Sequence, residues 1–596
     1  MASFSVHAQP WSSSCQPAAA APSQRQCSTT PPWRRPWRQP RTRSPGTLRC
    51  RQAQQQLLLS TGEWIVQLER LKEEVGNMIT SSVTSSLLER LHLIDALERL
   101  CVNHLFEEEI NILLMQISSS NNVNDCDDVR TVAMWFYLLR KHGYKVSQDV
   151  FVKFKDEEGN FIAKNPMDLL ALYNAAHYRV HGEKILDDAI LFTKRCLHSM
   201  LPSLEGSLAR EVKCALEIPL PRRVGIYEAN YYISTYEKEG KVHDMIVQLA
   251  KLNFNLMQLQ YQEELDIITR WWKDLQIQSK LPFARDRIVE CYLWMLGVYY
   301  EPNCSRGRII LTKVISIATI FDDTFDSYGT IEECELFTKC LERFYFIWEL
   351  VADELPDCMK HVLEKVFQSY QIIEQELSED EKYRMPYLRS FTEDLVRNYN
   401  REVKMREESY VPKSVEEHLQ ISSRTGACHL LACVSLVGMD VTATKESFDW
   451  VSTMPKMVLA LCTTLRLVDD LKTYEVINIY LSSPSLGYSI KNDIFSDVRE
   501  QLTPHVASSI DSYMKQHDVS IEMARFKIEE LKEEQWKDFN DEWLDPDSAQ
   551  PRKLLEAIFN LTRTMEFIYN QADNFTYCHN LKDTISSLLV EAFPVN

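Results

Sequence analysis

The chain has 596 residues and a formal net charge of −19, with 45% hydrophobic and 25% charged residues. This length fits two domains or a large helical array better than one compact core, and the hydrophobic content allows a sizeable core. A strongly acidic chain is a poor match for a phosphate backbone, so we expect no nucleic-acid partner.

The spacing of apolar residues predicts an all-helical protein. The chain has only 15 glycines, and long stretches carry apolar residues three and four positions apart, as on one face of an α-helix. Its 16 cysteines include no C-x-x-C pair, so we expect reduced cysteines that pack as small apolar residues. The best apolar run, residues 430–437, is too short to cross a bilayer; we expect no membrane span, and a monomer.

Residues 1–62 differ in composition from the rest of the chain. They contain eight arginines and no Asp, Glu or Lys, and they are rich in Ser, Pro and Gln. Such a segment cannot build a core, so we expect it to be unstructured. The composition also describes a plastid transit peptide, and an unstructured tail or a wrongly assigned first exon explains it equally well. We therefore expect a cytoplasmic protein, or a plastid protein if this segment acts in targeting.

Two helical blocks follow this segment. From Glu63 onward apolar residues recur at helical spacing, as in Leu87, Leu91 and Ile94, with short polar breaks between the helices. We expect an N-terminal helical domain over residues 63–241 and a second helical domain over residues 242–596. No repeat of fixed period is present, which weighs against a solenoid.

An acidic stretch in the second block, residues 320–326, reads Ile-Phe-Asp-Asp-Thr-Phe-Asp and follows an apolar helical run. Asp322 and Asp326 are one turn apart on one helix face, with Asp323 about a quarter turn away. Two carboxylates on one face suit Mg²⁺, which is usually held by one or two carboxylates plus phosphate oxygens of a substrate. The alternative is a solvated acidic surface, which explains most such triplets.

Two arginines and a tryptophan precede this stretch. Arg285 and Arg287 lie 37 and 35 residues before Asp322, and arginine is suited to charge-assisted binding of phosphate oxygens. Trp294 follows Arg287 by seven positions, so an indole on the same helix face could contact a cationic carbon skeleton. The alternatives are solvated surface charges for the arginines and a core aromatic residue for Trp294.

A second acidic cluster occurs at residues 465–475, where Asp469 and Thr473 lie one turn apart. With this cluster the chain resembles a plant class I terpene synthase over residues 63–596. Residues 322–326 match the D-D-x-x-D motif of that family, residues 285–287 match its R-x-R motif, and residues 469–473 begin its (N/D)-D-x-x-(S/T)-x-x-x-E motif. The body of the chain is most similar to grass sesquiterpene synthases. The resemblance implies a vestigial N-terminal helical domain and a catalytic C-terminal α-helical bundle.

The second metal motif is interrupted. The family places its third ligand eight positions after the first, but that position here is Ile477, and Glu475 points about 120° away from the required face. Removing residues 476–498 joins Glu475 to Arg499 and places Glu500 at the eighth position. We interpret these 23 residues as an in-frame insertion from a retained intron or a wrongly assigned exon, which sequencing of the transcript would test. The insertion predicts impaired activity.

The resemblance implies a role for each candidate residue. The implied metal ligands, holding three Mg²⁺ ions or Mn²⁺ in their place, are Asp322, Asp323, Asp326, Asp469, Thr473 and Glu500. The implied diphosphate-binding residues are Arg285, Arg287 and Arg466, together with Asp322, Asp326 and Asp469. The catalytic set comprises these arginines together with Trp294, Tyr569 and Asp573, of which Tyr569 and Asp573 resemble the pair at the base of the family's pocket.

The implied activity is Mg²⁺-dependent ionisation of a prenyl diphosphate, followed by cyclisation or rearrangement to a terpene with release of diphosphate. We expect farnesyl diphosphate as the substrate, with geranyl diphosphate as the alternative. One rival hypothesis is a catalytically silent protein that binds prenyl diphosphate without turnover. Another is a trans-prenyltransferase, which would carry a second D-D-x-x-D motif in place of the Asp/Thr/Glu pattern.

Three further stretches bear on the resemblance. Residues 125–128 read Asp-Cys-Asp-Asp, like the acid motif of class II cyclases, but lie three residues out of register with it, and we interpret them as an inter-helix loop. Thr425-Gly426-Ala427 resembles the helix break of the family's active site. The family's N-terminal R-R-x8-W element is absent, which puts closure of the active site in doubt.

Overall fold

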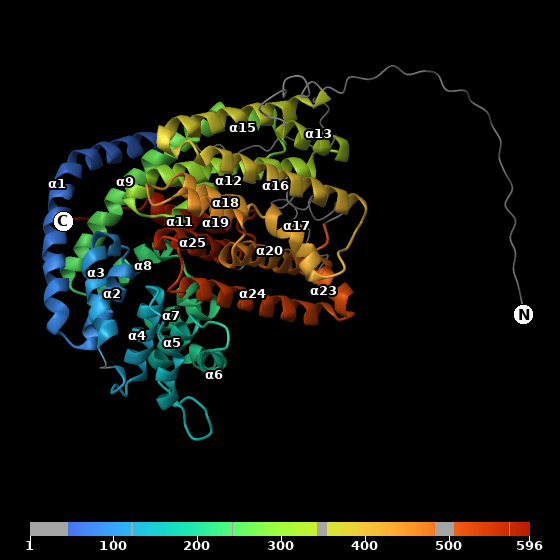
Figure 1. The fold of residues 1–596 in the computed structure, drawn as a ribbon. Coiled ribbons are helices and arrows are strands. Elements are labelled where there is room, and N and C mark those ends of the chain that lie inside the picture. The colour runs from blue at the N-terminus through green and yellow to red at the C-terminus, as the bar shows by residue number, and fades with distance from the viewer. Residues whose placement is uncertain are drawn as a thin grey trace, which may run out of the picture.

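The structure is a computed structural model that describes residues 46–595 except 121–122, 241, 343–353, 483–505 and 571. Within these residues the chain is all-α, as predicted, and its extended pairing is limited to one isolated bridge between Lys155 and Phe161. Figure 1 shows two groups of helices, with α24 running between them.

The first helix begins earlier than we predicted. Helix α1 (Gly46–Ser81) starts inside the segment that we expected to be unstructured, whereas residues 1–45 lie outside the described residues. The prediction is therefore wrong for residues 46–62. The reason is local: residues 52–59 read Gln-Ala-Gln-Gln-Gln-Leu-Leu-Leu, and these residue types have high helix propensity.

The remaining helices of the N-terminal group are short and joined by tight connections. They are α2 (Leu87–Arg99), α3 (Glu107–Ser119), α4 (Val129–Lys141), α5 (Pro166–Ala176), α6 (Lys184–Met200), α7 (Gly206–Glu217) and α8 (Gly225–Glu239). The domain boundary that we predicted after residue 241 falls between α8 and the next helix.

The second group forms the bundle that carries both acidic motifs. Its first helices are α9 (Asp244–Asp274), α10 (Ile277–Lys280), α11 (Ile288–Val298), α12 (Ser305–Ser327), α13 (Ile331–Glu342), α15 (Asp357–Glu376) and α16 (Arg384–Glu407). They are followed by α17 (Val415–Thr425), α18 (Cys428–Val437), α19 (Lys445–Ser452), α20 (Lys456–Ser482), α23 (Ser509–His517), α24 (Ile521–Trp543), α25 (Arg552–Ile568) and α26 (Lys582–Leu589).

Short 3₁₀ turns complete the connections. They span Ser82–Thr84, Asn103–Leu105, Gln148–Phe154, Leu201–Ser203, Leu220–Arg222, Pro302–Cys304, Glu379–Glu381 and Cys578–Leu581.

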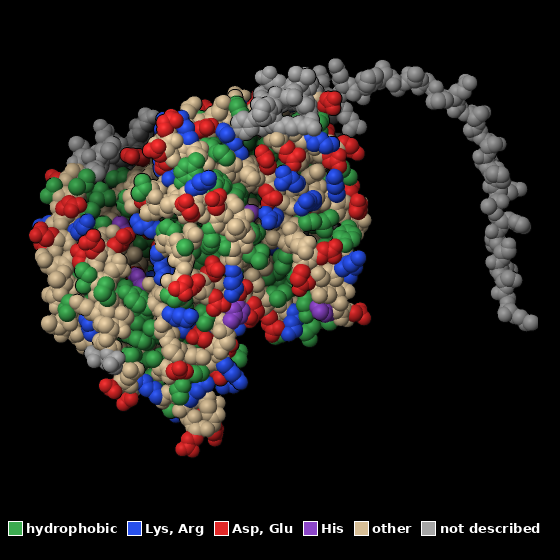
Figure 2. All heavy atoms as spheres, in the orientation of Figure 1, with side chains coloured by type: hydrophobic (Ala, Val, Ile, Leu, Met, Phe, Trp, Pro, Cys, Tyr) green, Lys and Arg blue, Asp and Glu red, His purple; other side chains and the backbone are tan. Residues whose placement is uncertain are grey.

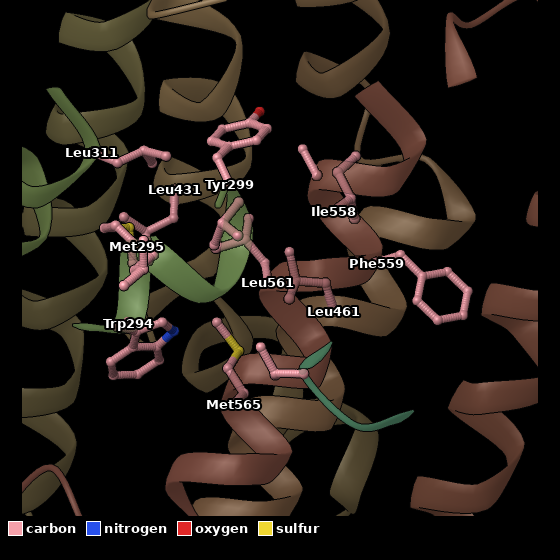
Figure 3. Close-up of a cluster of buried hydrophobic side chains, with 14 of the residues drawn as sticks. Trp294, Met295, Tyr299, Leu311, Leu431, Leu461, Ile558, Phe559, Leu561 and Met565 are labelled. Carbon is pink, nitrogen blue, oxygen red and sulfur yellow. The ribbon is translucent and has the colours of Figure 1, made fainter. Parts of the chain in front are cut away.

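The core of the bundle lies where α11, α12, α18, α20 and α25 meet. Figure 3 shows its apolar side chains, among them Met295, Leu311, Leu461 and Met565, all of them buried. Burial of such side chains is worth roughly 1.5–3 kcal/mol each, which holds these five helices in one fixed arrangement. Helix α24 packs along α20, and α1 packs along α9 on the opposite side of the molecule (Figure 1).

Residues 125–128 belong to an inter-helix connection, as predicted. Asp128 is the N-cap of α4: its Oδ2 accepts hydrogen bonds from the backbone N–H of Thr131 at 3.0 Å and from the Thr131 hydroxyl at 2.5 Å. A carboxylate at this position satisfies N–H groups that the first turn of a helix leaves without partners. Asp128 thus has a structural role at a helix start.

On the face drawn in Figure 2, Lys and Arg side chains are interspersed with Asp and Glu side chains. Among the described residues, no single helix combines the length and the apolar composition of a membrane span. One bent pair, Lys445–Ser452 with Lys456–Tyr474 at 52° to each other, passes that test on length and composition when the two helices are taken together.

Candidate active site

A cavity of about 520 Å³ opens at one end of the helical bundle. Its walls come from α11, α12, α16, α20 and the break between α17 and α18, and from the segment that follows α25. Nine of the predicted site residues line it: Arg285, Trp294, Asp322, Asp326, Arg466, Asp469, Thr473, Tyr569 and Asp573. Arg287 and Asp323 do not, and Glu500 lies outside the described residues.

The first acidic wall is the C-terminal end of α12. Asp322 and Asp326 both face the cavity, as the helical spacing predicted, and both are partly exposed, with 32% and 40% of their side chains accessible. The apolar residues before them, such as Ile317 and Phe321, are buried in the core. Burial of this apolar face therefore points the two carboxylates at the cavity.

Asp323 has a different environment from its neighbours. It is buried; its Oδ2 accepts a hydrogen bond from the backbone N–H of Arg285, and its Oδ1 forms an ion pair with the Arg285 Nε, both at 2.8 Å. Burial raises the pKa of Asp323 to about 6, against the lowering effect of the Arg285 charge. We had included Asp323 among the metal ligands. Asp323 does not line the cavity, and both of its oxygens lie close to Arg285, so its role as a metal ligand stays a prediction.

The two arginines of the R-x-R motif point in different directions. Arg285 lines the cavity and its Nη2 lies 2.6 Å from Oδ2 of Asp322. Arg287 instead donates from Nε to the carbonyl of Phe575 and from Nη2 to the carbonyl of Thr576, each at 2.9 Å. In this structure Arg287 holds the segment after α25 and does not line the cavity, so the substrate contact of Arg287 stays a prediction.

The second acidic wall is α20, opposite α12. Asp469 lines the cavity, and burial raises its pKa to about 7 although the Arg466 guanidinium lies 3.1 Å away. Asp470 is buried as well, but hydrogen bonds from His418 and from the backbone N–H of Ser509 outweigh the effect of burial and lower its pKa to about 2. Asp470 thus anchors α20 to α17 and α23, although it also lines the cavity beside Asp469.

Thr473 lies one turn after Asp469 and also lines the cavity. Helix α20 continues to Ser482, so its backbone remains helical through the first residues of the insertion that we predicted. The rest of that insertion, residues 483–498, lies outside the described residues, as does Glu500. The interruption of the second motif therefore stays a prediction.

An aromatic wall faces the two acidic walls. Trp294 is buried, as an aromatic of the core would be, and it also lines the cavity, with ring centroids 5.4 Å from Phe575 and 6.4 Å from Tyr569. Asp573 accepts the backbone N–H groups of Phe575 and Thr576, each at 3.0 Å, which shapes the turn after α25. The faces of aromatic rings carry negative potential and attract cations.

The helix break at residues 425–427 is present. Helix α17 ends at Thr425 and α18 begins at Cys428, and Ala427 between them has the left-handed backbone φ of +59°. All three break residues line the cavity. A Cβ at Gly426 would lie 2.6 Å from Cδ2 of Leu465, so glycine permits the close approach of α20 at this point.

One wall was missed by the sequence reasoning. Tyr399, Glu402 and Arg406 of α16 line the cavity, at positions i, i+3 and i+7 of one helix face. Glu402 is buried and accepts from the Thr425 hydroxyl at 2.8 Å, and Arg406 contacts the end of α12. The only available signal was this spacing of three polar side chains on a helix, which does not differ from that of many solvated faces.

Two family models match the chain. The terpene synthase N-terminal domain matches residues 47–216, and the metal-binding domain of the terpene synthase family matches residues 273–479 and 480–538. The chain belongs to the terpene synthase family. The resemblance inferred from the three motifs is thereby confirmed, as is the two-domain all-α architecture.

Among named relatives, this terpene synthase is 54% identical to the chloroplastic alpha-terpineol synthase of Zea mays over 530 residues, 88% of this chain and 80% of that protein. It is 43% identical to the beta-sesquiphellandrene synthase of Sorghum bicolor over 523 residues, 88% of this chain and 90% of that protein.

Solved structures show the same fold. One is isoprene synthase from grey poplar with three Mg²⁺ ions and dimethylallyl-S-thiolodiphosphate, with a TM-score of 0.78 and 28% identity over 89% of this chain and 97% of that chain. Another is limonene synthase with 2-fluorolinalyl diphosphate, with a TM-score of 0.80 and 28% identity over 89% of this chain and 95% of that chain.

Members of this family are lyases that act on prenyl diphosphates, and this chain is such an enzyme with a domain for a divalent metal. The residues fit a divalent metal on chemical grounds. Asp322, Asp326 and Asp469 offer carboxylate oxygens and Thr473 offers a hydroxyl, all to one cavity. Hard oxygen donors of this kind suit Mg²⁺.

Proposed function

We propose that this terpene synthase ionises geranyl diphosphate in a Mg²⁺-dependent reaction and releases a terpene and diphosphate. The observation that carries the reaction type is the convergence of two acidic walls, from α12 and α20, with Arg285 and Arg466 on one cavity that aromatic side chains also line. The C10 substrate is supported by the 54% identity to a named alpha-terpineol synthase, which exceeds the 43% identity to a sesquiterpene synthase.

Farnesyl diphosphate, the substrate that we expected from the similarity to grass sesquiterpene synthases, is the second candidate. It is supported by several named relatives that are sesquiterpene synthases of grasses, including an (E)-beta-farnesene synthase of Zea mays at 41% identity. The two substrates share the same diphosphate group, so the acidic walls serve either one.

In this proposal Asp322 and Asp326 on one side, and Asp469 and Thr473 on the other, would hold three Mg²⁺ ions; Glu500 would be a further ligand once it stands eight positions after Asp469. When bound, Mg²⁺ neutralises the diphosphate charge and makes diphosphate a better leaving group. Arg285 and Arg466 flank the acidic walls and stabilise the departing negative charge.

The aromatic wall acts on the other product of ionisation. Trp294, Phe575 and Tyr569 line the cavity, where their rings would exclude water and stabilise the allylic cation. Asp573 lies at the same wall, and its charge adds to the effect of burial in raising the pKa of Tyr569. Tyr569 and Asp573 are the groups that we assign to guiding or accepting a proton in the final step.

The experiment is incubation of the purified full chain with geranyl or farnesyl diphosphate and Mg²⁺, followed by gas chromatography and mass spectrometry of volatile products. We expect terpenes from both, with the higher kcat/KM for geranyl diphosphate, and none with chelator or with the Asp322→Asn variant. A higher kcat/KM for farnesyl diphosphate would favour the second candidate. Longer prenyl diphosphates would indicate a prenyltransferase, and unchanged substrate would indicate the silent protein.

We propose a monomer in the cytoplasm; the alternative is a plastid location, if the Arg- and Ser-rich residues 1–62 act as a transit peptide. A fluorescent protein fused after residue 62 and expressed in leaf cells would test the location; fluorescence confined to plastids would support the alternative.

A further inference from the structure

Helix α16 lies along the end of α12 that carries the first acidic motif. Its residue Arg406 is 12% exposed and lines the cavity beside Asp326. The Nη1 atom donates to the backbone carbonyl of Asp326 at 2.8 Å, and both terminal nitrogens lie 3.4 Å from the carbonyl of Phe325. The Asp326 carboxylate is more distant, 3.9 Å from Nη1. The main contact of this guanidinium is therefore with backbone carbonyls.

These carbonyls belong to the last turn of α12, which ends at Ser327. The last four carbonyls of a helix have no partner within it. Here the backbone N–H groups of Tyr328 and Gly329 both donate to the carbonyl of Thr324. Among the described hydrogen bonds, the carbonyls of Phe325 and Asp326 accept from Arg406 instead. A cation at this end also interacts favourably with the helix dipole.

The Asp326 carboxylate depends on this turn for its direction. Its side chain is 40% exposed at the cavity, so burial does not fix it. Asp322 lies one turn earlier on α12, and its carboxylate forms an ion pair with Arg285 at 2.6 Å. The backbone of the turn that Arg406 caps carries the Asp326 side chain, so the shape of this turn contributes to the direction of the carboxylate.

We propose that Arg406 is a positioning residue that holds the last turn of α12 in shape and so aims the Asp326 carboxylate at the metal-binding cavity. The proposal rests on the function proposed above for its catalytic consequence, but the capping itself is a property of the metal-free chain. Lysine is a poor replacement, because a single ammonium group does not reach two carbonyls with the fixed geometry of a guanidinium fork.

The test uses three variants of the full chain: Arg406→Gln, Arg406→Lys and the control Arg401→Gln. Arg401 is exposed on the same helix, and its guanidinium contacts Asn398 of that helix at 3.2 Å. The first measurement is hydrogen–deuterium exchange of the metal-free proteins, followed by mass spectrometry of peptides that cover residues 318–329. We expect faster exchange in this peptide for Arg406→Gln, a smaller increase for Arg406→Lys, and no change for Arg401→Gln.

The second measurement is calorimetric titration of Mg²⁺ in the presence of inorganic diphosphate. Loss of a charged helix cap weakens Mg²⁺ binding by about tenfold in Arg406→Gln, since such caps and charge-assisted hydrogen bonds are worth on the order of 1–2 kcal/mol. Arg406→Lys should bind Mg²⁺ more tightly than Arg406→Gln and less tightly than the wild type.

Two results would overturn the proposal. If diphosphate binding weakens while exchange over residues 318–329 is unchanged, Arg406 contacts the diphosphate directly. If exchange rises throughout the chain together with a lower Tm, Arg406 has a general structural role. Because exchange is measured without turnover, the proposal can fail or succeed independently of whether the chain is an active synthase.

Discussion

Arg285 and Asp323 are joined at two points: the Arg285 backbone N–H donates to one carboxylate oxygen of Asp323, and the Arg285 Nε forms an ion pair with the other, both at 2.8 Å. The same guanidinium reaches Asp322 through Nη2 at 2.6 Å. The middle residue of the acidic motif thus orients an arginine, whereas its neighbours face the cavity.

This arrangement predicts different effects of two similar substitutions. Asp322→Asn removes a proposed metal ligand and is expected to lower kcat/KM by more than about 100-fold with a higher Mg²⁺ requirement. Asp323→Asn disturbs Arg285 and is expected to lower kcat/KM by roughly 10- to 100-fold, as for outer-shell partners of metal ligands. Steady-state kinetics over a range of Mg²⁺ concentrations separates them. An equal rise in Mg²⁺ requirement for both variants would contradict the distinction.

The hydrogen bonds of Arg287 give a second prediction. Arg287 donates to the carbonyls of Phe575 and Thr576 and so holds this segment at one side of the cavity. Arg287→Ala releases this segment, so water should reach the cation more often. We expect a lower kcat and a larger share of alcohols among the products, measured by gas chromatography. Arg287→Lys serves as the conservative control with a smaller change. An unchanged product ratio in Arg287→Ala would show that the segment is held by other contacts.

Helical periodicity was sufficient to predict the all-α class and the face shared by Asp322 and Asp326. It succeeded because residues such as Ile317 and Phe321 are buried in the core, so the polar face of α12 has to point away from the core. The helix break at residues 425–427 could be predicted from Gly426, a residue type that allows Leu465 to approach the backbone closely.

The contacts of Asp323 and Arg287 could not be predicted from helical periodicity. Both belong to short motifs whose residues were assigned a common role, yet each is turned from the cavity by a partner far along the chain. Asp323 meets Arg285 across 38 residues, and Arg287 meets Phe575 across 288. Arg406 was missed for the same reason, since its partners on α12 are 80 and 81 residues away. Spacing along one helix carries no information on such pairs.

The junction of the two helical groups gives a stability prediction. Glu533 of α24 accepts from both terminal nitrogens of Arg222 at 2.7 Å and from Arg179 at 2.9 Å. Arg222 is only 3% exposed, so Glu533→Ala leaves a buried guanidinium without its main partner, at a cost of about 3 kcal/mol. The control Glu534→Ala removes a carboxylate that is 47% exposed and should change stability by less than about 0.5 kcal/mol. Urea unfolding at neutral pH checks both.

The same contact has a defined pH dependence. Despite burial, the charges and hydrogen bonds of Arg222 hold the pKa of Glu533 well below its ordinary value of 4.5. The stabilisation from a carboxylate with a lowered pKa is fully present above the unfolded value and is lost as the pH falls through the folded one. The stability difference between the wild type and Glu533→Gln should therefore stay constant above about pH 4.5 and shrink below it. A difference that shrinks near pH 6 would contradict this assignment.

The interrupted second metal motif gives a further prediction. Deletion of residues 476–498 joins Glu475 to Arg499 and places Glu500 eight positions after Asp469, on the helix face that already presents Asp469 and Thr473 to the cavity. We expect the deleted chain to turn over prenyl diphosphate faster than the full chain at the same Mg²⁺ concentration, because the deletion restores one metal ligand. The expected increase is roughly 10- to 100-fold, as is typical when a contact at a metal site is lost or regained. Glu500→Gln in the deleted chain is the matched control and should return the rate to that of the full chain. Equal Mg²⁺-dependent turnover by the full and the deleted chains would show that the ligand is supplied without the deletion.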